Sequence, residues 1–285
     1  MLFSKKQKKT RITNSVVTFA KFLQFIATPL AANFVLKIFQ SPLHHKMPQR
    51  EQFMYKSAKK ERLKIPTINK EIQIYNYGYS KKKILIVHGW AGRGTQLFTI
   101  SDRLLENGYM VVSFDGPAHG FSEGKRTHIT DFIEAIKTIQ DKYGPFEAAI
   151  GHSFGGMVLL KSTAYFLKIN KLVIIGTSND VRNVIHDLAN KLQLKAAVAE
   201  HVLKKLEKQF KTNIETMTSA ASAKKIEIPT LVIHDSSDKE IPVSCAYQIR
   251  QNLKKGTLLI TKDLGHQRIL KDIAVQNRII EFLKD

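Results

Sequence analysis

The chain has 285 residues, 43% of them hydrophobic, and a formal net charge of +21. The apolar content excludes a largely disordered chain, and the length allows one large core with a small additional subdomain. Because most basic residues are Lys, the first interpretation of the charge is a compositional bias; attraction to anionic lipid, nucleic acid or an acidic substrate is the second. The single cysteine, Cys245, excludes an intrachain disulfide and fits a reducing compartment, so we expect a cytoplasmic protein.

Residues 1–64 form a basic extension outside the pattern of the rest of the chain. Five Lys or Arg residues occur within residues 1–14, and an apolar-rich stretch follows at 16–39. Lys21 and Lys37 are among the residues that interrupt this stretch, so no apolar run is long enough for a membrane-spanning helix. We expect a helical extension that packs on the body. Peripheral contact with an anionic membrane surface remains open as an alternative, because several phenylalanines lie beside lysines.

Residues 40–64 are polar and contain prolines, which is typical of a connector with a short helix. His44 and His45 are adjacent there but have no further ligand nearby in the sequence. We therefore expect no metal site.

After this extension, short apolar runs alternate with segments of helical periodicity. We expect strands at residues 71–77, 83–88, 110–114, 148–150, 172–175, 230–234 and 257–260, and helices at 97–106, 128–143, 157–167, 244–252 and 269–283. The first strand alternates apolar and polar residues, which indicates an exposed antiparallel strand, whereas the others are mostly apolar, which indicates buried strands. Buried strands separated by helices predict an α/β fold with a mostly parallel, twisted sheet flanked by helices.

The strand signal disappears between residues 179 and 225. We expect helices there at residues 181–192, 196–210 and 213–222. The predicted organisation is therefore an extension at 1–64, a core of residues 65–178 and 226–285, and a helical insertion at 179–225.

The sequence Gly151-His152-Ser153-Phe154-Gly155 joins a predicted strand to a predicted helix. A serine in such a sharp turn, with glycines two residues away on both sides, is typical of a nucleophile elbow. The glycines allow close approach of the backbone, and strained dihedral angles present the hydroxyl group. Because Gly and Ser are common in turns, the pattern alone indicates an ordinary connection equally well.

Polar motifs also follow three other strands. His88-Gly89-Trp90 follows the first buried strand, Asp238 lies shortly after the strand at 230–234, and His266 follows the last strand. Parallel sheets bind ligands at the carboxyl ends of their strands, so these residues are expected near Ser153. A serine nucleophile needs a base, and the base needs a carboxylate that orients it.

With these motifs in order, residues 70–285 resemble a serine hydrolase of the α/β-hydrolase superfamily, esterase-like or lipase-like. The resemblance implies that Ser153 is the nucleophile, Asp238 the acid and His266 the base, and that the N–H groups of Trp90 and Phe154 form the oxyanion hole. It also implies that the insertion forms a helical cap over the active site. The turn at 115–122 resembles one that shapes the site in this family.

The acid has two alternatives, Asp235 and Glu240. Asp238 is preferred because the Lys-Glu-Ile-Pro sequence after it matches the family's pattern. The histidines of the site-forming turns, His88, His119 and His152, are expected to be structural, and His234 is expected to be buried and hydrogen-bonded. Cys245 is expected in the core, and His201 of the insertion on a solvated face.

The expected reaction is acyl transfer to water through an acyl-enzyme, with a small-molecule ester as substrate and no metal or organic cofactor. A thioesterase, peptidase, acyltransferase or carbon–carbon hydrolase would use the same residues, and a non-catalytic ligand-binding module would keep the fold. Dehalogenase and epoxide hydrolase activities are disfavoured because Ser153 stands where those enzymes need a carboxylate. No nucleic-acid recognition motif occurs, so no specific nucleic acid is expected. The sequence identifies no substrate-binding residues.

Overall fold

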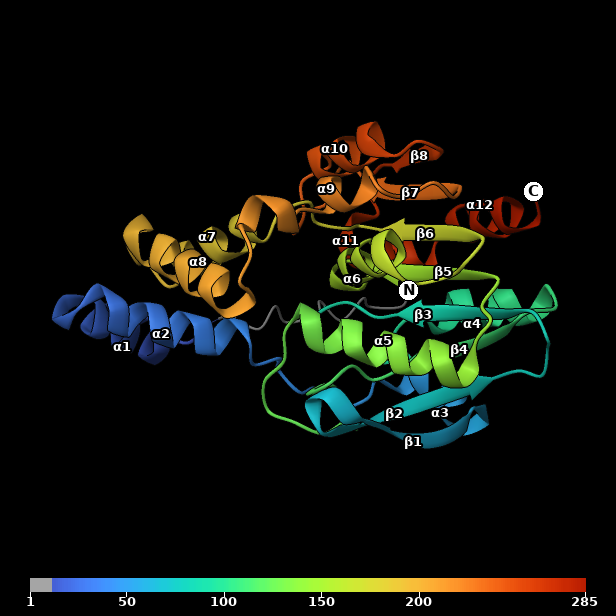
Figure 1. The fold of residues 1–285 in the computed structure, drawn as a ribbon, viewed down its shortest axis with the longest axis horizontal. Helices are drawn as coiled ribbons and strands as arrows, with labels where there is room; N and C mark the ends of the chain where they lie inside the picture. Colours follow the sequence, from blue (N-terminus) through green and yellow to red (C-terminus); the bar gives the residue numbers. More distant parts are fainter. Residues whose placement is uncertain (1–11) are drawn as a thin grey trace, which may run out of the picture. The chain divides into compact units, whose positions relative to one another are not determined.

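An eight-stranded sheet organises the larger part of the chain (Figure 1). The computed structural model describes residues 12–285. The strands are β1 (Lys59–Ile65), β2 (Lys70–Tyr77), β3 (Lys83–Val87), β4 (Met110–Phe114), β5 (Ala148–His152), β6 (Lys171–Ile175), β7 (Thr230–Asp235) and β8 (Gly256–Thr261). Their order is β1-β2-β4-β3-β5-β6-β7-β8, with β1 and β2 antiparallel to their neighbours and the other strands parallel. The predicted α/β fold with a mostly parallel sheet is confirmed.

Helices cover both faces of this sheet, and each face has its own apolar cluster. The α-helices of the sheet-containing part are α3 (Gln52–Ser57), α4 (Phe98–Glu106), α5 (Ile129–Tyr143), α6 (Phe154–Tyr165), α9 (Ser219–Ala223), α10 (Ser244–Asn252), α11 (Gly265–Arg268) and α12 (Ile273–Lys284). Leu85 and Val87 of β3 pack with α5 and α6, whereas Ile84 and Ile86 pack with α4 and α12. Successive side chains of a strand point to opposite faces, so an apolar strand such as β3 requires a helical layer on each side.

The short connections include four 3₁₀ turns. They are η1 (Gln49–Glu51), η2 (Pro66–Ile68), η3 (Ile214–Met217) and η4 (Ile269–Lys271). Two predicted helices are each divided by such a turn. Residues 213–222 form η3 and α9, and residues 269–283 form η4 and α12 because Asp272 caps the backbone N–H of Val275 and starts a new helix.

The prediction for residues 40–64 is wrong at its C-terminal end, where Lys59–Ile65 forms strand β1. Its charged side chains conceal a short alternation in which Leu63 and Ile65 are buried. The antiparallel prediction for the following strand is correct, but its exposed character is not. Because β1 and β4 pair with its two edges, the last four residues of β2 are buried.

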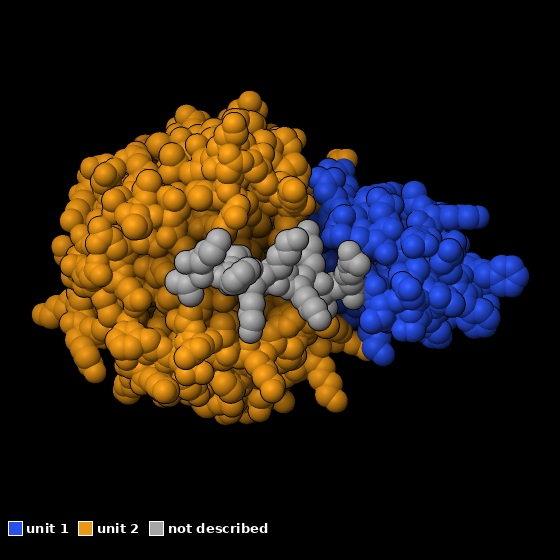
Figure 2. All heavy atoms as spheres, turned by 180° about the vertical axis from the view of Figure 1, so that it is seen from behind, with its two compact units in different colours: residues 1–39, 181–214 blue, residues 40–180, 215–285 orange. Residues whose placement is uncertain are grey.

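The chain forms two compact units, coloured separately in Figure 2. The larger contains Gln40–Asp180 and Glu215–Asp285, and therefore the whole sheet. The smaller combines the chain up to Phe39 with Val181–Ile214. The first 11 residues of the predicted basic extension lie outside the described residues.

The smaller unit is a group of helices from two distant parts of the sequence. They are α1 (Asn14–Ile26), α2 (Thr28–Phe39), α7 (Val181–Lys191) and α8 (Ala196–Phe210). Helix α2 packs on α1, α7 and α8, and α7 packs on α8 (Figure 1). Small buried residues such as Ala20, Ala31 and Ala32 allow this close approach. The N-terminal helices thus pack with the helical insertion. None of the described helices combines the length and apolarity needed to cross a bilayer.

Candidate active site

Ser153 occupies a strained turn between β5 and α6. Its φ of 53° and ψ of −117° lie where a non-glycine residue is rarely found. Its N–H donates to the carbonyl oxygen of Ile175 at 2.8 Å, which fixes the turn to the end of the neighbouring strand β6. The side chain is half-buried. This conformation is that of a nucleophile elbow, as the Gly-x-Ser-x-Gly spacing predicts.

The glycines of the elbow are required by close backbone contacts. A Cβ atom on Gly155 would lie 2.2 Å from the carbonyl oxygen of Val87, and one on Gly151 would lie 2.7 Å from the backbone of Gly155. Contacts this short are prohibitive. The start of α6 can therefore lie against the end of β3 only because residue 155 has no side chain, and against the end of β5 only because residue 151 has none.

The loop after β3 lies next to the serine. A Cβ atom on Gly89 would be 3.2 Å from the Cβ of Ser153, so the two backbones are in close contact. The indole of Trp90 meets the ring of Phe154 edge-on, with 5.3 Å between ring centroids. Phe154 is the first residue of α6, where N–H groups have no acceptor within the helix and carry partial positive charge. The structure therefore brings both predicted oxyanion-hole residues beside Ser153.

His266 and Asp238 form a buried hydrogen-bonded pair. Nδ1 of His266 donates to Oδ2 of Asp238 at 2.7 Å, and the side chains are 6% and 1% exposed. Burial alone would raise the pKa of Asp238, but the hydrogen bond and charge of His266, with N–H donors from Ile241 and Glu240, lower it below its usual value. Asp238 therefore remains ionised and fixes the proton of His266 on Nδ1, which leaves Nε2 as an acceptor.

The two alternative acids have other roles. Asp235 accepts hydrogen bonds from the N–H groups of Ser237 and Leu264 and the hydroxyl of Thr261, so it ties the loops after β7 and β8 together. Burial raises its pKa, but these donors lower it further than burial raises it. Glu240 has an exposed side chain, and its contribution near the site is its backbone N–H. None of these hydrogen bonds joins Asp235 or Glu240 to His266, whereas Asp238 is bonded to it directly.

Two contacts around the pair have no counterpart in the sequence-based prediction. His152 donates from Nε2 to the carbonyl oxygen of His266 at 3.0 Å, and their rings lie 4.7 Å apart. Gly176, with φ of 58°, follows β6 so closely that a Cβ atom would be 3.2 Å from Nδ1 of His266 and 3.8 Å from Asp238. A glycine directly after a strand at the carboxyl edge was the available signal for the second contact. Nothing in the sequence indicated the first.

The remaining histidines of the site-forming turns are buried and hydrogen-bonded. His88 accepts from the N–H of Gly116 and donates to the carbonyl of Gly89, and His119 accepts from the N–H of Ala91. Burial lowers the pKa of His88 far below its usual value and that of His119 to about 4. Both rings are therefore neutral, and both hold the turns around Trp90.

Three other residues weighed from the sequence are also accounted for structurally. His234 donates to the carbonyl of Ile241, and burial lowers its pKa. Cys245 is buried in α10, and burial raises the pKa of its thiol, so it is a poor nucleophile. His201 lies on α8 and bonds to the carbonyl oxygen of Ala197.

A buried polar network supports the loop that carries Trp90. Arg93 lies 3.6 Å from Glu51, which also accepts from the hydroxyl of Thr95 at 2.8 Å. The N–H of Gly94 donates to Asp115, a fully buried carboxylate that Tyr75 also contacts. Burial raises the pKa of Asp115. This network joins η1, the loop after β3 and the turn after β4.

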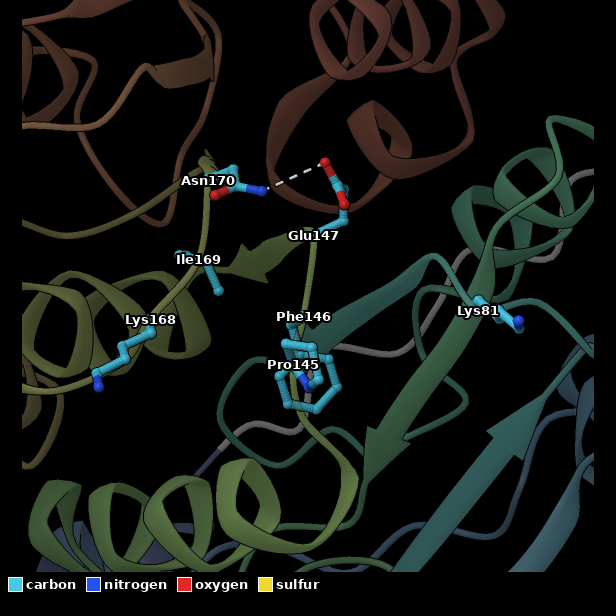
Figure 3. Close-up of a pocket in the computed structure, with 7 residues that line it drawn as sticks. All are labelled: Lys81, Pro145, Phe146, Glu147, Lys168, Ile169 and Asn170. Carbon is cyan, nitrogen blue, oxygen red and sulfur yellow. Dashed lines mark hydrogen bonds between the residues drawn. The ribbon is translucent and has the colours of Figure 1, made fainter.

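A pocket of about 530 Å³ lies at the opposite edge of the sheet, where β5 and β6 begin (Figure 3). It is lined by Lys81, residues 145–147 and residues 168–170. It contains none of the predicted site residues. Within residues 12–285, no three His, Cys, Asp or Glu side chains are grouped to hold a metal ion.

Family models match most of the chain. The α/β-hydrolase fold model matches residues 82–202, and a model described as TAP-like protein matches residues 205–285. The chain belongs to the α/β-hydrolase superfamily. This membership supports a hydrolase activity.

Solved structures with the α/β-hydrolase fold resemble the chain at low sequence identity. An esterase from Pyrococcus furiosus has 19% identity and a TM-score of 0.67, covering 86% of this chain and 97% of its own. A bromoperoxidase from Bacillus anthracis has 17% identity and a TM-score of 0.62, covering 80% and 100%. A protein from Acinetobacter baumannii described as a putative lipase has 19% identity and a TM-score of 0.62, covering 83% of this chain and 94% of its own. No curated protein matches the sequence. At these identities the neighbours show the fold alone.

Proposed function

We propose that this protein is a serine hydrolase that cleaves a carboxylic ester through an acyl-enzyme. The observation that carries the proposal is the 2.7 Å contact between His266 and Asp238, together with the strained elbow of Ser153. A buried, ionised carboxylate that orients a histidine is the arrangement a serine nucleophile needs. The esterase and lipase neighbours agree with this chemistry.

The mechanism follows from the protonation states. The hydroxyl of Ser153 attacks the ester carbonyl carbon, and its proton moves to Nε2 of His266, because Nδ1 already carries the proton shared with Asp238. Asp238 stabilises the imidazolium that forms. The imidazolium then protonates the leaving alcohol, and the acyl group stays on Ser153.

The N–H groups of Trp90 and Phe154 would stabilise the negative charge on the carbonyl oxygen. Each such donor accelerates the reaction by roughly 10²- to 10³-fold in related chemistry. Water then attacks the acyl-enzyme and His266 accepts its proton. His266 returns this proton to the oxygen of Ser153 as the bond to the acyl group breaks, which releases the acid product and restores the free serine. The proposed steps need no metal or organic cofactor.

The decisive experiment combines labelling with turnover. The wild-type protein, Ser153→Ala and a control, Ser244→Ala, whose serine is exposed on α10, are treated with a fluorophosphonate and examined by mass spectrometry. Hydrolysis of p-nitrophenyl esters of increasing acyl length is measured in parallel. We expect one label and turnover in the wild type and the control, and neither in Ser153→Ala.

Absence of both labelling and turnover in the wild type would contradict the proposal and favour a ligand-binding protein. If labelling occurs but esters are not cleaved, thioesters, peptides and amides tested on the same variants identify the reaction. The chain-length profile measures the size of the acyl pocket.

A further inference from the structure

Helix α1 and the start of α2 expose a group of large apolar side chains, here named the aromatic surface. Its members are Phe19 (49% exposed), Phe22 (56%), Phe25 (88%), Ile26 (55%) and Leu30 (43%). Residues 19, 22 and 26 are spaced to share one face of an α-helix, and residue 25 lies beside them. Single exposed apolar residues are ordinary, but a contiguous group marks an interaction surface.

These side chains remain exposed although the helices already have packing partners. Ala20 of α1 and Ala31, Ala32 and Val35 of α2 are fully buried, and α2 packs on α7 and α8. Phe19 also meets Phe34 edge-on at 5.2 Å between ring centroids. The core of the smaller unit is therefore formed by another face, and it does not account for Phe22 and Phe25.

The charge of this unit indicates what the aromatic surface binds. Residues 1–39 contain seven Lys or Arg and no Asp or Glu, and residues 181–214 contain seven basic and three acidic residues. Fourteen basic against three acidic residues supply about half of the formal charge of +21. A chain segment of this charge attracts an anionic partner, and the exposed phenylalanines require a partner that also accepts apolar groups.

We propose that the aromatic surface binds the surface of an anionic phospholipid bilayer. Phe22 and Phe25 enter the boundary between head groups and acyl chains, and basic residues of the same unit, such as Lys21, contact the head groups. A second copy of the chain is a poorer occupant, because two identical units of this charge repel each other. A nucleic acid offers the charge but does not bury aliphatic groups such as Ile26 and Leu30. The proposal is independent of the proposed hydrolase activity.

The test is co-sedimentation of the full-length protein with vesicles. One set of vesicles contains phosphatidylcholine alone, and the other contains about 30% phosphatidylserine. The test variant is Phe22→Ser with Phe25→Ser. The matched control is Phe53→Ser with Ile273→Ser, which removes two exposed apolar side chains, each 70% exposed, from the larger unit. Circular dichroism and melting temperature verify that all variants are folded, and turnover of a soluble ester is measured alongside.

We expect the wild type and the control to bind anionic vesicles, with at least tenfold weaker binding to neutral ones. The test variant should bind anionic vesicles roughly 10- to 100-fold more weakly than the wild type, because two aromatic rings no longer enter the bilayer. Raising the salt concentration should weaken the binding of the wild type. Ester turnover should be the same in all folded variants.

Three results would overturn the proposal. The first is unchanged binding of the folded test variant, because the aromatic surface would then not be the contact. The second is equal binding to neutral and anionic vesicles. The third is no binding of the wild type to either kind of vesicle. If the wild type instead forms a dimer or a nucleic-acid complex that the phenylalanine substitutions abolish, the aromatic surface binds that partner.

Discussion

His152 holds the backbone of His266: its Nε2 donates to the carbonyl oxygen of that residue at 3.0 Å. The first residue immediately precedes the proposed nucleophile, and the second is the proposed base. Burial lowers the pKa of His152 to about 3, so its ring is neutral near neutral pH. The contact therefore sets the spacing between nucleophile and base without adding a charge to the site.

Replacing His152 should impair catalysis more than substrate binding. In His152→Asn the shorter side chain no longer reaches the carbonyl of His266, so the base is less well held, and kcat should fall about tenfold or more with KM nearly unchanged. Steady-state kinetics with a p-nitrophenyl ester measures both. His201→Asn, which removes a similar histidine-to-carbonyl bond on α8, is the control and should have wild-type kinetics. A variant of His152 that keeps full kcat would argue against a positioning role.

Substitution of Asp238 should lower activity, whereas substitution of Asp235 should lower stability. In Asp238→Asn the amide cannot hold the same His266 tautomer, and kcat should fall by roughly 10³-fold or more. In Asp235→Asn the loops after β7 and β8 lose a shared acceptor, so the melting temperature should fall while the folded protein retains most of its activity. Kinetics below the melting transition and thermal unfolding measure the two effects. The reverse outcome would assign the acid to Asp235.

Acid should destabilise the wild type partly through Asp238. The pKa of Asp238 is lower in the folded protein than in the unfolded chain, where an Asp side chain has a pKa of about 3.9. The unfolded state therefore takes up the proton at a higher pH than the folded state does. The stabilisation is therefore complete above about pH 5 and is lost as the pH falls through the folded pKa. Urea unfolding at a series of acidic pH values should show a shallower loss in Asp238→Asn. Parallel curves for the two proteins would exclude this contribution.

Gly155→Ala should severely disturb the elbow. The new Cβ would meet the carbonyl oxygens of Val87 and His88 at 2.2 and 2.6 Å, and neither backbone can move without distorting β3. We expect a loss of at least about 3 kcal/mol in the free energy of unfolding, or no folded protein. Gly108→Ala is the control, because a Cβ there meets nothing within 4 Å and only its φ of 80° costs energy, about 1 kcal/mol. Chemical denaturation compares the two, and equal losses would contradict the steric argument.

Glu51→Gln should destabilise the protein because it leaves Arg93 buried without its carboxylate. Removing one partner of a buried ion pair costs about 3–5 kcal/mol. The control is Glu227→Gln, which breaks an exposed pair with Lys254 and should leave the melting temperature unchanged. Equal melting temperatures for the two variants would show that the buried pair contributes little.

Sequence patterns were sufficient for the parallel sheet because most of its strands are short, mainly apolar runs bounded by turns. Strand β1 was missed because five of its seven residues, 59–62 and 64, are charged, and it is stabilised by pairing with β2. The strand is stabilised by its partner and not by the intrinsic preference of its own residues, so the sequence of this segment alone does not predict it.

The candidate site was predictable where short motifs occur at strand ends. Ser153 and Asp238 lie 85 positions apart by residue number, yet both follow parallel strands, and this places them at one edge. The Lys-Glu-Ile-Pro sequence after Asp238 was enough to prefer it over Asp235, and the hydrogen bonds give the physical distinction: Asp238 contacts His266, whereas Asp235 accepts from Thr261. The link between His152 and His266 joins a side chain to a backbone carbonyl oxygen. Every residue has such a carbonyl group, so the sequence does not show which one accepts the bond.

The smaller unit has a consequence for synthesis in the cell. Helices α1 and α2 leave the ribosome before α7 and α8, on which α2 packs, because residues 40–180 are made in between. At about 5 to 20 residues per second, this interval lasts roughly 7 to 30 s. During that time α1 is the only one of these packing partners of α2 that has been made, so the surface that α7 and α8 later cover stays exposed in the nascent chain and favours aggregation.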